Sequence, residues 1–538
     1  MERGGLVEHL ADPDAYPEPT SRVEVVQTHI SWIFLTDRFA YKVKKPVNFG
    51  FLDYTTLEQR RACCEREVIL NSRLCPDTYL GVVEITDSDG RLVIGGEGPV
   101  VEVAVKMVRL PDERMLRKVL ARGEGDTELF VRLAHTLAAF HARARLSGEA
   151  AQLKGLEGVR FNCEENFQQT ERYVGRLLTA GDFELIRTST RLFFARRPAL
   201  FARRVAAGRI VDGHGDVHLD SICATSPPRI FDCIEFNERF RIQDAAEEVA
   251  FLAMDLEFNG YAPFSRVFVD AYVEAAGDPE LADLLAFYKC YRAYVRAKVH
   301  SFLAEDPAVG AETRRGSEAT ARRYYELAAR YATLFNPRRL IVTCGLTGSG
   351  KSTLARRLAE RYHLHLIRSD VTRKALLGLA PEERRHVPFN EGEYAPSITE
   401  RTYTAMVEGA AARLAAGDSV ILDGCFIKRH QRAAAVELAR RLGVPLLVLE
   451  CRTAEEVIRQ RLEQRARKTS AVSDGRWEIY RQQVEEFEPP DELAGDERVI
   501  VDRSRPVEEL LEELAEVVPA EWQDAGALPE AARSREAP

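Results

Sequence analysis

The sequence predicts an α+β N-terminal domain with two lobes, followed by an α/β domain in which helices flank a parallel sheet. Three observations predict this order. Short strand patterns, interrupted by one helix, fill residues 21–110, and helical patterns dominate residues 111–304. Over residues 338–520 apolar strands alternate with helices, which is typical of βαβ units and a parallel sheet.

Composition predicts the remaining segments. Residues 1–20 are rich in Pro, Asp and Glu and are expected to be a loose lead-in. Residues 305–337 are charged and helical, and are expected to form a linker that ends at Asn336-Pro337. The polar segment 521–538 is expected to be a frayed tail.

The bulk numbers exclude several classes of protein. The 538 residues are 45% hydrophobic and 30% charged, as in soluble globular proteins, and no apolar run reaches the ~20 residues of a membrane span. The N-terminus opens no signal peptide, and the ten scattered cysteines form no C-x-x-C pair. We therefore expect a cytoplasmic protein without a zinc site or a disulfide framework. The net charge of −9 argues against general nucleic-acid binding.

The most specific chemical signal follows the apolar strand 340–344 and precedes the helix 353–360. It is Gly345-Leu346-Thr347-Gly348-Ser349-Gly350-Lys351-Ser352-Thr353. This stretch matches G-x-x-x-x-G-K-[ST], the P-loop, whose backbone N–H groups cradle nucleotide phosphates. Lys351 is expected to reach the β- and γ-phosphates of ATP, and Ser352 is expected to bind Mg²⁺.

Two further strands bring carboxylates to the same edge of the predicted sheet. A strand over 363–370 ends at Asp370, with Arg373 one turn later if a helix begins there, and a strand over 419–423 ends at Asp423. Ligands of open parallel sheets bind at the carboxyl ends of strands. We expect Asp370 to take the proton of an attacking hydroxyl and Arg373 to steady the transferring phosphoryl group, although Asp370 also fits a helix cap. Asp423 resembles a Walker B acid, which implies Mg²⁺ binding.

Arginines cluster after a fourth strand, 445–451. Arg461 and Arg465 are one helical turn apart and precede a polar stretch through residue 474. This pattern fits a lid that closes over ATP, with Arg465 contacting the nucleotide. A solvated basic helix face explains the same arginines equally well.

The C-terminal half, about 180 residues, resembles the small P-loop kinases, which include gluconate kinase, chloramphenicol phosphotransferase, the zeta toxins and the kinase domain of polynucleotide kinase. Its Asp370-x-x-Arg373 pair looks like the acceptor-side base and arginine of the polynucleotide kinase group. The resemblance implies that a hydroxyl accepts the phosphate, and it does not identify the acceptor.

Residues 214–221, H-G-D-V-H-L-D-S, resemble the H-G-D-x-H-x-x-N catalytic loop of aminoglycoside phosphotransferases. The resemblance implies that Asp216 accepts the proton of the substrate hydroxyl. The metal-binding Asn of that family falls at Ser221, which is a weaker Mg²⁺ ligand. Asp232, in a strand predicted over 229–236, looks like the Asp of D-F-G and would hold Mg²⁺. Asp244 either braces the catalytic loop or caps a helix.

The residues that precede this loop in the sequence also resemble motifs of the same family, in the same order along the chain. Lys42, in a strand over 39–42, is expected to pair with the α- and β-phosphates, with Lys44 as the runner-up. Its carboxylate partner is expected on the helix 60–74, where Glu67 lies in the apolar arc and Glu65 projects to the opposite side. His141 resembles a helix histidine of the family, and a core or loop-bracing role is favoured over a catalytic one.

The whole chain resembles a bacterial fusion of an aminoglycoside phosphotransferase-like domain with a small P-loop kinase domain. This resemblance implies an ATP- and Mg²⁺-dependent kinase with two nucleotide sites, which phosphorylates a hydroxyl of a small polar acceptor. The alternative is a P-loop kinase or ATPase regulated by a catalytically weak, ligand-sensing N-terminal domain. A toxin-like kinase acting on a cell-wall precursor or a nucleic-acid end is a third hypothesis.

Overall fold

A computed structural model describes residues 3–48, 52–307, 309–335, 338–362, 364–380, 392–466, 476–495 and 497–515. The chain forms two compact units, Met1–Val159 with Arg203–Ala293 and Arg160–Ala202 with Tyr294–Pro538. This division differs from the predicted domains, whose boundaries stay a prediction. The predicted boundary Asn336-Pro337 and the predicted tail 521–538 lie outside the described residues. Among the helices that the model describes, none has the length and apolarity to cross a membrane.

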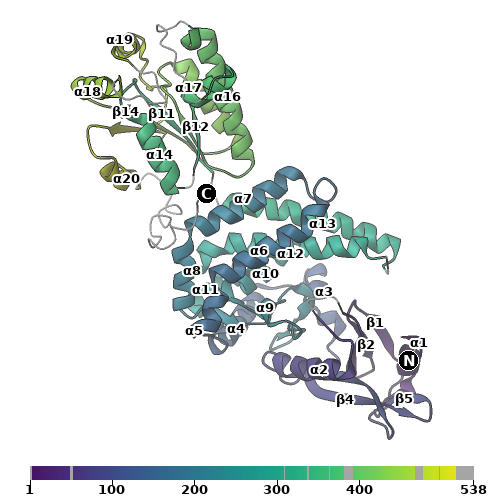
Figure 1. Ribbon diagram of the computed structural model, residues 1–538. Coiled ribbons are helices and arrows are strands. Elements are labelled where there is room, and N and C mark those ends of the chain that lie inside the picture. The colour runs from purple at the N-terminus through teal and green to yellow at the C-terminus, as the bar shows by residue number, and fades with distance from the viewer. Residues whose placement is uncertain are drawn as a thin grey trace. The chain divides into compact units, whose positions relative to one another are not determined.

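The first unit contains a six-stranded antiparallel sheet with the strand order β1-β2-β3-β6-β4-β5, counted over its described residues. The strands are β1 (Glu24–Gln27), β2 (Ser31–Leu35), β3 (Phe39–Lys44), β4 (Tyr79–Ser88), β5 (Arg91–Ile94) and β6 (Val100–Val108). Helix α2 (Leu57–Asn71) begins at a capping box on Thr56 and packs against β4 and β6 (Figure 1). The sheet and α2 therefore form the predicted small lobe.

The prediction of a loose lead-in is wrong. Residues 3–15 form α1 (Arg3–Leu10) and the short helix η1 (Pro13–Ala15). Leu10 and Tyr16 are buried with Phe34 and Tyr41 of the sheet, and the Tyr16 hydroxyl donates to the Leu10 carbonyl over 2.6 Å. Composition suggested disorder because it averages over the few apolar side chains that anchor this segment.

The rest of the first unit is mainly helical. Its helices are α3 (Leu116–Ala121), α4 (Thr127–Arg143), α5 (Gly148–Leu153), α9 (Glu238–Arg241), α10 (Ala245–Phe258) and α11 (Ala262–Ala276). Short strands lie between them, namely β7 (Ile210–Asp212), β8 (Ile222–Cys223), β9 (Arg229–Ile230) and β10 (Ile242–Asp244). The helices α6 (Leu156–Thr170), α8 (Pro198–Ala206) and α12 (Leu281–Glu305) contribute residues to both units.

Helix α10 holds the loop that follows β7. Glu248 is fully buried and accepts hydrogen bonds from the backbone N–H groups of His214 and Gly215, over 2.7 and 2.8 Å. Its other oxygen lies 2.7 Å from Nε2 of His141 on α4, which gives His141 the loop-bracing role. Burial alone raises the pKa of Glu248, but the hydrogen bonds from His141 and Gly215 outweigh burial and lower it to about 2. A buried negative charge therefore fixes the shape of this loop.

Asp244 does not brace the loop, and the helix-cap alternative is the one that the structure contains. The Asp244 carboxylate accepts from the backbone N–H of Ala246 over 2.8 Å at the start of α10. The same carboxylate lies 2.6 Å from Nη2 of the buried Arg204. The residue that contacts the loop is one helical turn further along, at Glu248, because that position faces the loop backbone.

The second unit contains α7 (Ala180–Arg196), which packs against α13 (Ala311–Phe335). It continues into a parallel sheet whose described strands have the order β12-β13-β11-β14-β15. They are β11 (Leu340–Cys344), β12 (His365–Arg368), β13 (Val420–Asp423), β14 (Leu446–Arg452) and β15 (Arg498–Asp502). The helices are α14 (Lys351–Tyr362), α15 (Ser369–Leu376), α16 (Pro396–Ala415), α17 (Arg429–Leu442), α18 (Glu455–Ala466), α19 (Trp477–Glu486) and α20 (Val507–Ala515).

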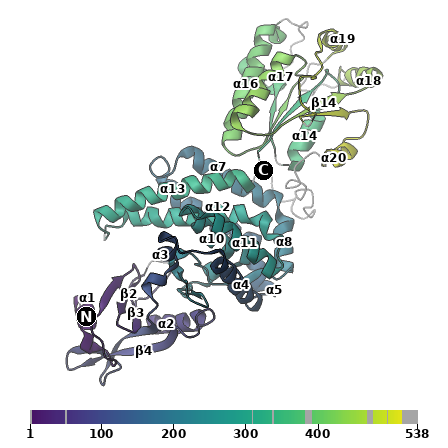
Figure 2. The ribbon, with the colours of Figure 1, turned by 180° about the vertical axis from the view of Figure 1, so that it is seen from behind.

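Helices cover both faces of this sheet. Alternate residues of β11 point to opposite faces, so Leu340 and Val342 pack with α16 and α17, and Ile341 packs with α14 and α20. Figures 1 and 2 show the two pairs of helices on the two sides of the strands. The predicted fold class is confirmed for both halves.

Replacing Glu248 by Gln tests the loop brace. A carboxylate whose pKa falls from 4.5 to about 2 on folding contributes about 3 kcal/mol above pH 4.5, and this contribution is lost as the pH falls through about 2. We expect Glu248→Gln to lower the free energy of unfolding by about this amount at pH 7, and the difference from the parent to shrink between pH 5 and pH 2. Urea titrations at several pH values measure it.

Glu238→Gln is the matched control, since the Glu238 side chain on α9 is 68% exposed. A difference for Glu248→Gln that stays constant with pH would contradict the ionised brace.

Candidate functional site

The predicted P-loop joins β11 to α14 and has the backbone that its glycines were expected to allow. Gly345, Gly348 and Gly350 have φ values of +134°, +80° and +90°, which L side chains rarely adopt. A Cβ atom at Gly345 would also lie 2.5 Å from the carbonyl oxygen of Cys451. These positions therefore require glycine, both for the turn and for the close approach of β14.

Lys351, Ser352 and Asp423 lie together at the carboxyl ends of β11 and β13. The Lys351 ammonium donates to the Leu346 carbonyl over 2.6 Å, inside the loop. The Ser352 hydroxyl donates to Asp423 Oδ1 over 3.1 Å, and Arg368 Nε lies 3.3 Å from the other carboxylate oxygen. A hydroxyl and a carboxylate at this spacing are the oxygen donors that Mg²⁺ prefers in kinase sites, so these two residues fit the ion.

Asp370 and Arg373 also lie side by side, but the strand predicted over 363–370 is wrong at its end. Strand β12 stops at Arg368, and Asp370 lies in the first turn of α15, where it makes no capping hydrogen bond. Arg373 Nη1 is 3.5 Å from Asp370 Oδ1, and the guanidinium carbon is 4.6 Å from the ring centre of Tyr394. Arg373 is buried, and its Nε has no hydrogen-bond partner among the described residues.

One cavity of about 320 Å³ joins these groups. Its lining includes Thr347, Gly348, Gly350, Lys351, Ser352 and Thr353 of the P-loop, together with Asp370, Arg373 and Asp423. Other described lining residues come from α16, α17 and α19. The cavity thus connects the predicted phosphate-binding groups with the predicted acceptor-side pair.

The lid arginines are only partly described. Arg461 on α18 donates from Nη2 to the carbonyl of Arg503 over 2.8 Å. Arg465 lies in the same helix, but its side chain and the polar stretch 467–475 fall outside the described residues. Sequence analysis missed Arg503, whose Nε would be 3.2 Å from a Cβ atom at Gly350. Its position just after β15, at the carboxyl edge of the sheet, was the signal that could have found it.

In the first unit Glu67 lies between both candidate lysines. Lys42 Nζ is 2.8 Å from Glu67 Oε1 and 2.6 Å from Asp232 Oδ1, and Lys44 Nζ is 2.6 Å from Glu67 Oε2. Burial raises the pKa of Glu67, but Lys42 and Lys44 lower it to about 2. The Glu67 carboxylate is therefore ionised. Lys42, the lysine predicted from the sequence, and Lys44, the alternative, both pair with it.

Asp232 does not lie in the strand predicted over 229–236. Strand β9 ends at Ile230, and Asp232 has a φ of +67°, an uncommon value for a residue with a side chain. Its backbone N–H donates to the Tyr79 hydroxyl over 3.2 Å, and its side chain is 55% exposed. A positive φ is incompatible with an extended strand, so the strand cannot continue through Asp232, and the resulting turn places the carboxylate beside Lys42.

Asp216 lies in the loop after β7 with a side chain that is 38% exposed, and its Oδ2 is 3.4 Å from His218 Nε2. Ser221 is buried, and its hydroxyl donates to the backbone carbonyls of Asp216 and His218, both over 3.0 Å. The Ser221 hydroxyl therefore shapes the loop, and the predicted metal contact of Ser221 stays a prediction. Sequence analysis also missed Glu248, because its partners are backbone N–H groups more than 30 residues away.

Comparison with known proteins finds family models that match two separate parts of the chain. Residues 100–288 match a model described as the phosphotransferase enzyme family, and residues 340–490 match a model described as an AAA domain. The uncharacterized proteins Rv2004c of Mycobacterium tuberculosis and Mb2027c of Mycobacterium bovis are each 32% identical over 462 residues, which cover 84% of this chain and 88% of theirs.

Solved structures similar to part of the chain include a sugar kinase from Janibacter and a gluconokinase from Sinorhizobium meliloti. Each is 23% identical and covers 34% of this chain, with TM-scores of 0.26 and 0.25. The alignments cover 98% and 91% of those two proteins.

The match to the mycobacterial proteins spans both halves of the sequence. The chain belongs to their family, and it joins a phosphotransferase-family domain to a P-loop kinase domain.

Proposed function

We propose that the chain is an ATP- and Mg²⁺-dependent phosphotransferase that transfers the γ-phosphate to a hydroxyl of a small polar acceptor. The observation that carries this proposal is the cavity with P-loop groups on one side and the Asp370–Arg373 pair on the other. Kinase-family and P-loop domains in general use ATP with Mg²⁺. The proposal extends this to a nucleotide site in each half of the chain.

The P-loop residues would bind the triphosphate through backbone N–H groups and Lys351, after its ammonium leaves the Leu346 carbonyl. Ser352 and Asp423 would hold Mg²⁺, which neutralises charge on the phosphates when it is bound. Arg368 keeps the Asp423 carboxylate oriented from the side opposite Ser352. Catalysis would thus depend mainly on positioning and on charge stabilisation.

Asp370 would accept the proton of the attacking hydroxyl, and Arg373 would stabilise the charge of the group in transfer. Arg373 is held in place by the Tyr394 ring and by Asp370, and its buried Nε is a donor for which the described residues supply no acceptor. A buried donor without a partner is unfavourable, and a phosphoryl oxygen would satisfy it once the Arg373 side chain shifts to expose Nε.

The charges of the cavity favour a neutral or singly cationic acceptor. Arg373 and Lys428 each have a carboxylate nearby, Asp370 at 3.5 Å and Glu486 at 3.2 Å. Glu400 adds an exposed carboxylate to the described lining. A nucleic-acid end carries several phosphates, which would face these carboxylates, so a sugar, an aminocyclitol or a nucleoside-like alcohol suits the cavity better.

Incubating the full chain with labelled ATP and a metabolite extract should identify the acceptor as the compound that gains phosphate. With that acceptor, we expect Asp370→Asn to lower kcat about 10²- to 10⁴-fold, because the hydroxyl loses its proton acceptor. The Kd for ATP should stay within about twofold, since Asp370 lies outside the phosphate loop.

Glu408→Gln, at an exposed position of α16, should leave kcat unchanged. An Asp370→Asn protein with the turnover of the parent would remove the proposed role of Asp370.

A second nucleotide site in the N-terminal half is favoured by one specific observation, the Lys42 ammonium between Glu67 and Asp232. This lysine, its helix carboxylate and the exposed Asp232 have the arrangement that kinase-like sites use for phosphates and Mg²⁺. Asp216 would align the acceptor hydroxyl there. The alternative is that this half senses a ligand and regulates the P-loop domain.

Two substitutions distinguish these two hypotheses about the function of the N-terminal half. If both halves are enzymes, Lys351→Ala and Asp216→Asn should each remove only part of the ATP consumption, because each acts on one site. If Asp216→Asn changes nothing and Lys351→Ala abolishes all turnover, the N-terminal half is regulatory.

A further inference from the structure

A second lysine–glutamate pair lies behind the first in the N-terminal half. Lys44, two residues after Lys42 on β3, is paired with Glu67 and also with Glu235. Glu235 follows Asp232 by three residues and accepts a hydrogen bond from the Tyr54 hydroxyl over 2.9 Å. The side chains of Lys44 and Glu67 are fully buried, and that of Glu235 is 5% exposed.

The two pairs form one continuous chain of charges that alternate in sign. In order, its members are Asp232, Lys42, Glu67, Lys44 and Glu235. The three inner members each have two partners, and the Asp232 end has the only strongly exposed side chain of the five. Among these five described side chains, Asp232 is therefore the one that solvent and a ligand reach readily, and Lys42 lies directly behind it.

Further contacts tie the Asp232–Glu235 segment to helix α2. The backbone N–H of Cys233 donates to Asn71 Oδ1 over 2.9 Å, and Arg66 Nη1 donates to the Glu235 carbonyl over 3.3 Å. Helix α2, strand β3 and this segment are thus held together by contacts of the protein itself. A site assembled in advance loses less ordering entropy when its ligand binds.

We propose that Lys44 and Glu235 are positioning residues for the nucleotide site of the N-terminal half, and that they let Lys42 exchange Asp232 for a phosphate. This inference rests on the proposed nucleotide site at Lys42 and Asp232. When Lys42 turns towards a phosphate, Lys44 still balances the buried charge of Glu67. When Asp232 turns towards Mg²⁺, Glu235 still holds its segment on β3.

The two residues act on Lys42 in opposite directions. Without the Lys44 ammonium, Lys42 is the one cationic partner that the described residues leave to Glu67, so Lys42 is held on Glu67. Without the Glu235 carboxylate, Lys44 is attracted to Glu67 alone, and Lys42 is drawn towards Asp232. Either change makes Lys42 or Asp232 less available to Mg²⁺-ATP, and removing both charges together restores part of the balance.

The test uses the full chain carrying Lys351→Ala, so that titration calorimetry with Mg²⁺-ATP reports the N-terminal site. We expect Glu235→Gln and Lys44→Met each to raise the Kd at least tenfold, and the double variant to raise it less than the product of the two. The loss for Glu235→Gln should be larger for Mg²⁺-ATP than for ATP without Mg²⁺. Glu235→Asp, which keeps the carboxylate, should recover most of the affinity.

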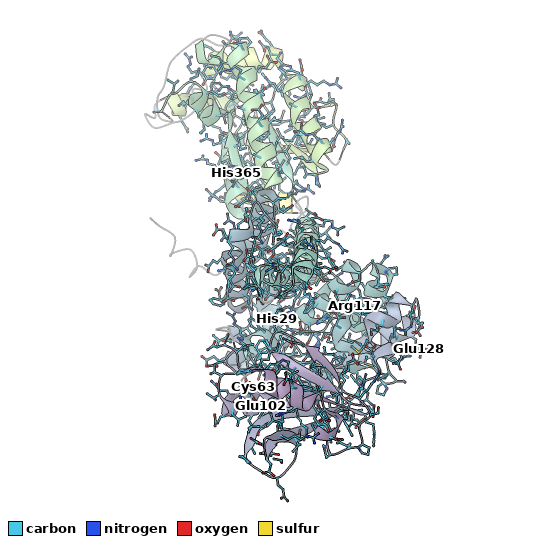
Figure 3. All side chains as sticks on the ribbon, turned by 90° about the vertical axis from the view of Figure 1, so that its right-hand side faces the viewer. His29, Cys63, Glu102, Arg117, Glu128 and His365 are labelled. Atoms are coloured by element: carbon cyan, nitrogen blue, oxygen red, sulfur yellow. The ribbon has the colours of Figure 1, made fainter. Side chains whose placement is uncertain are left out.

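The matched control is Glu102→Gln. Glu102 on β6, labelled in Figure 3, is a buried carboxylate of the same lobe and pairs with Arg60 of α2 at 2.7 Å, outside the charge chain. This control should lower the melting temperature as much as Glu235→Gln does and change the Kd less than twofold.

Two results would overturn the proposal, and they distinguish failure of the positioning role from failure of the nucleotide site itself. If Glu235→Gln lowers the melting temperature but binds Mg²⁺-ATP like its parent, Glu235 only supports the fold. If the Lys351→Ala parent itself binds no Mg²⁺-ATP, the nucleotide site of the N-terminal half fails, and the positioning role fails with it.

Discussion

A charge that leaves water must find an opposite charge or a set of hydrogen bonds, and this constraint shapes the N-terminal half of the chain. Glu67 is completely buried, and it is stable there because two ammonium groups lie 2.8 and 2.6 Å away. Glu248 is equally buried and is stabilised by backbone N–H groups and His141 instead. The first arrangement sets helix α2 against the sheet, and the second sets the shape of the loop that carries Asp216.

The P-loop domain positions its polar groups by a different route. Each strand of a parallel sheet ends at the same edge, so Ser352, Asp370 and Asp423 meet although they are up to about 70 residues apart in the chain. The helices on both faces supply the apolar packing that holds the strands in register. Here the topology of the sheet gathers the site, and the ion pairs only adjust the orientation of its side chains.

Sequence predicted the parts of the sites that follow local rules. The P-loop was recognised because its glycine spacing directly encodes a backbone, and Glu67 was chosen over Glu65 because helical periodicity turns it inwards. The positions of Asp232 and Asp370 were less accurate, since strand patterns do not show where ladder pairing stops. Glu235, Glu248 and Arg503 were missed because their partners lie far away in the sequence or belong to the backbone.

The two lysines that we propose to bind phosphate differ in what they must release. Lys351 donates to a neutral carbonyl, so replacing that acceptor by a phosphate oxygen adds an attraction between opposite charges. The exchange leaves no charged group of the protein without a partner. Lys42 is shared by two carboxylates, and a phosphate that takes it from Asp232 leaves that carboxylate without its cation. A cation must then reach Asp232 in the same event, which the 55% exposure of its side chain permits. Under this proposal geometry governs the P-loop site, whereas charge balance governs the proposed N-terminal site, where metal and nucleotide would have to bind as a single unit.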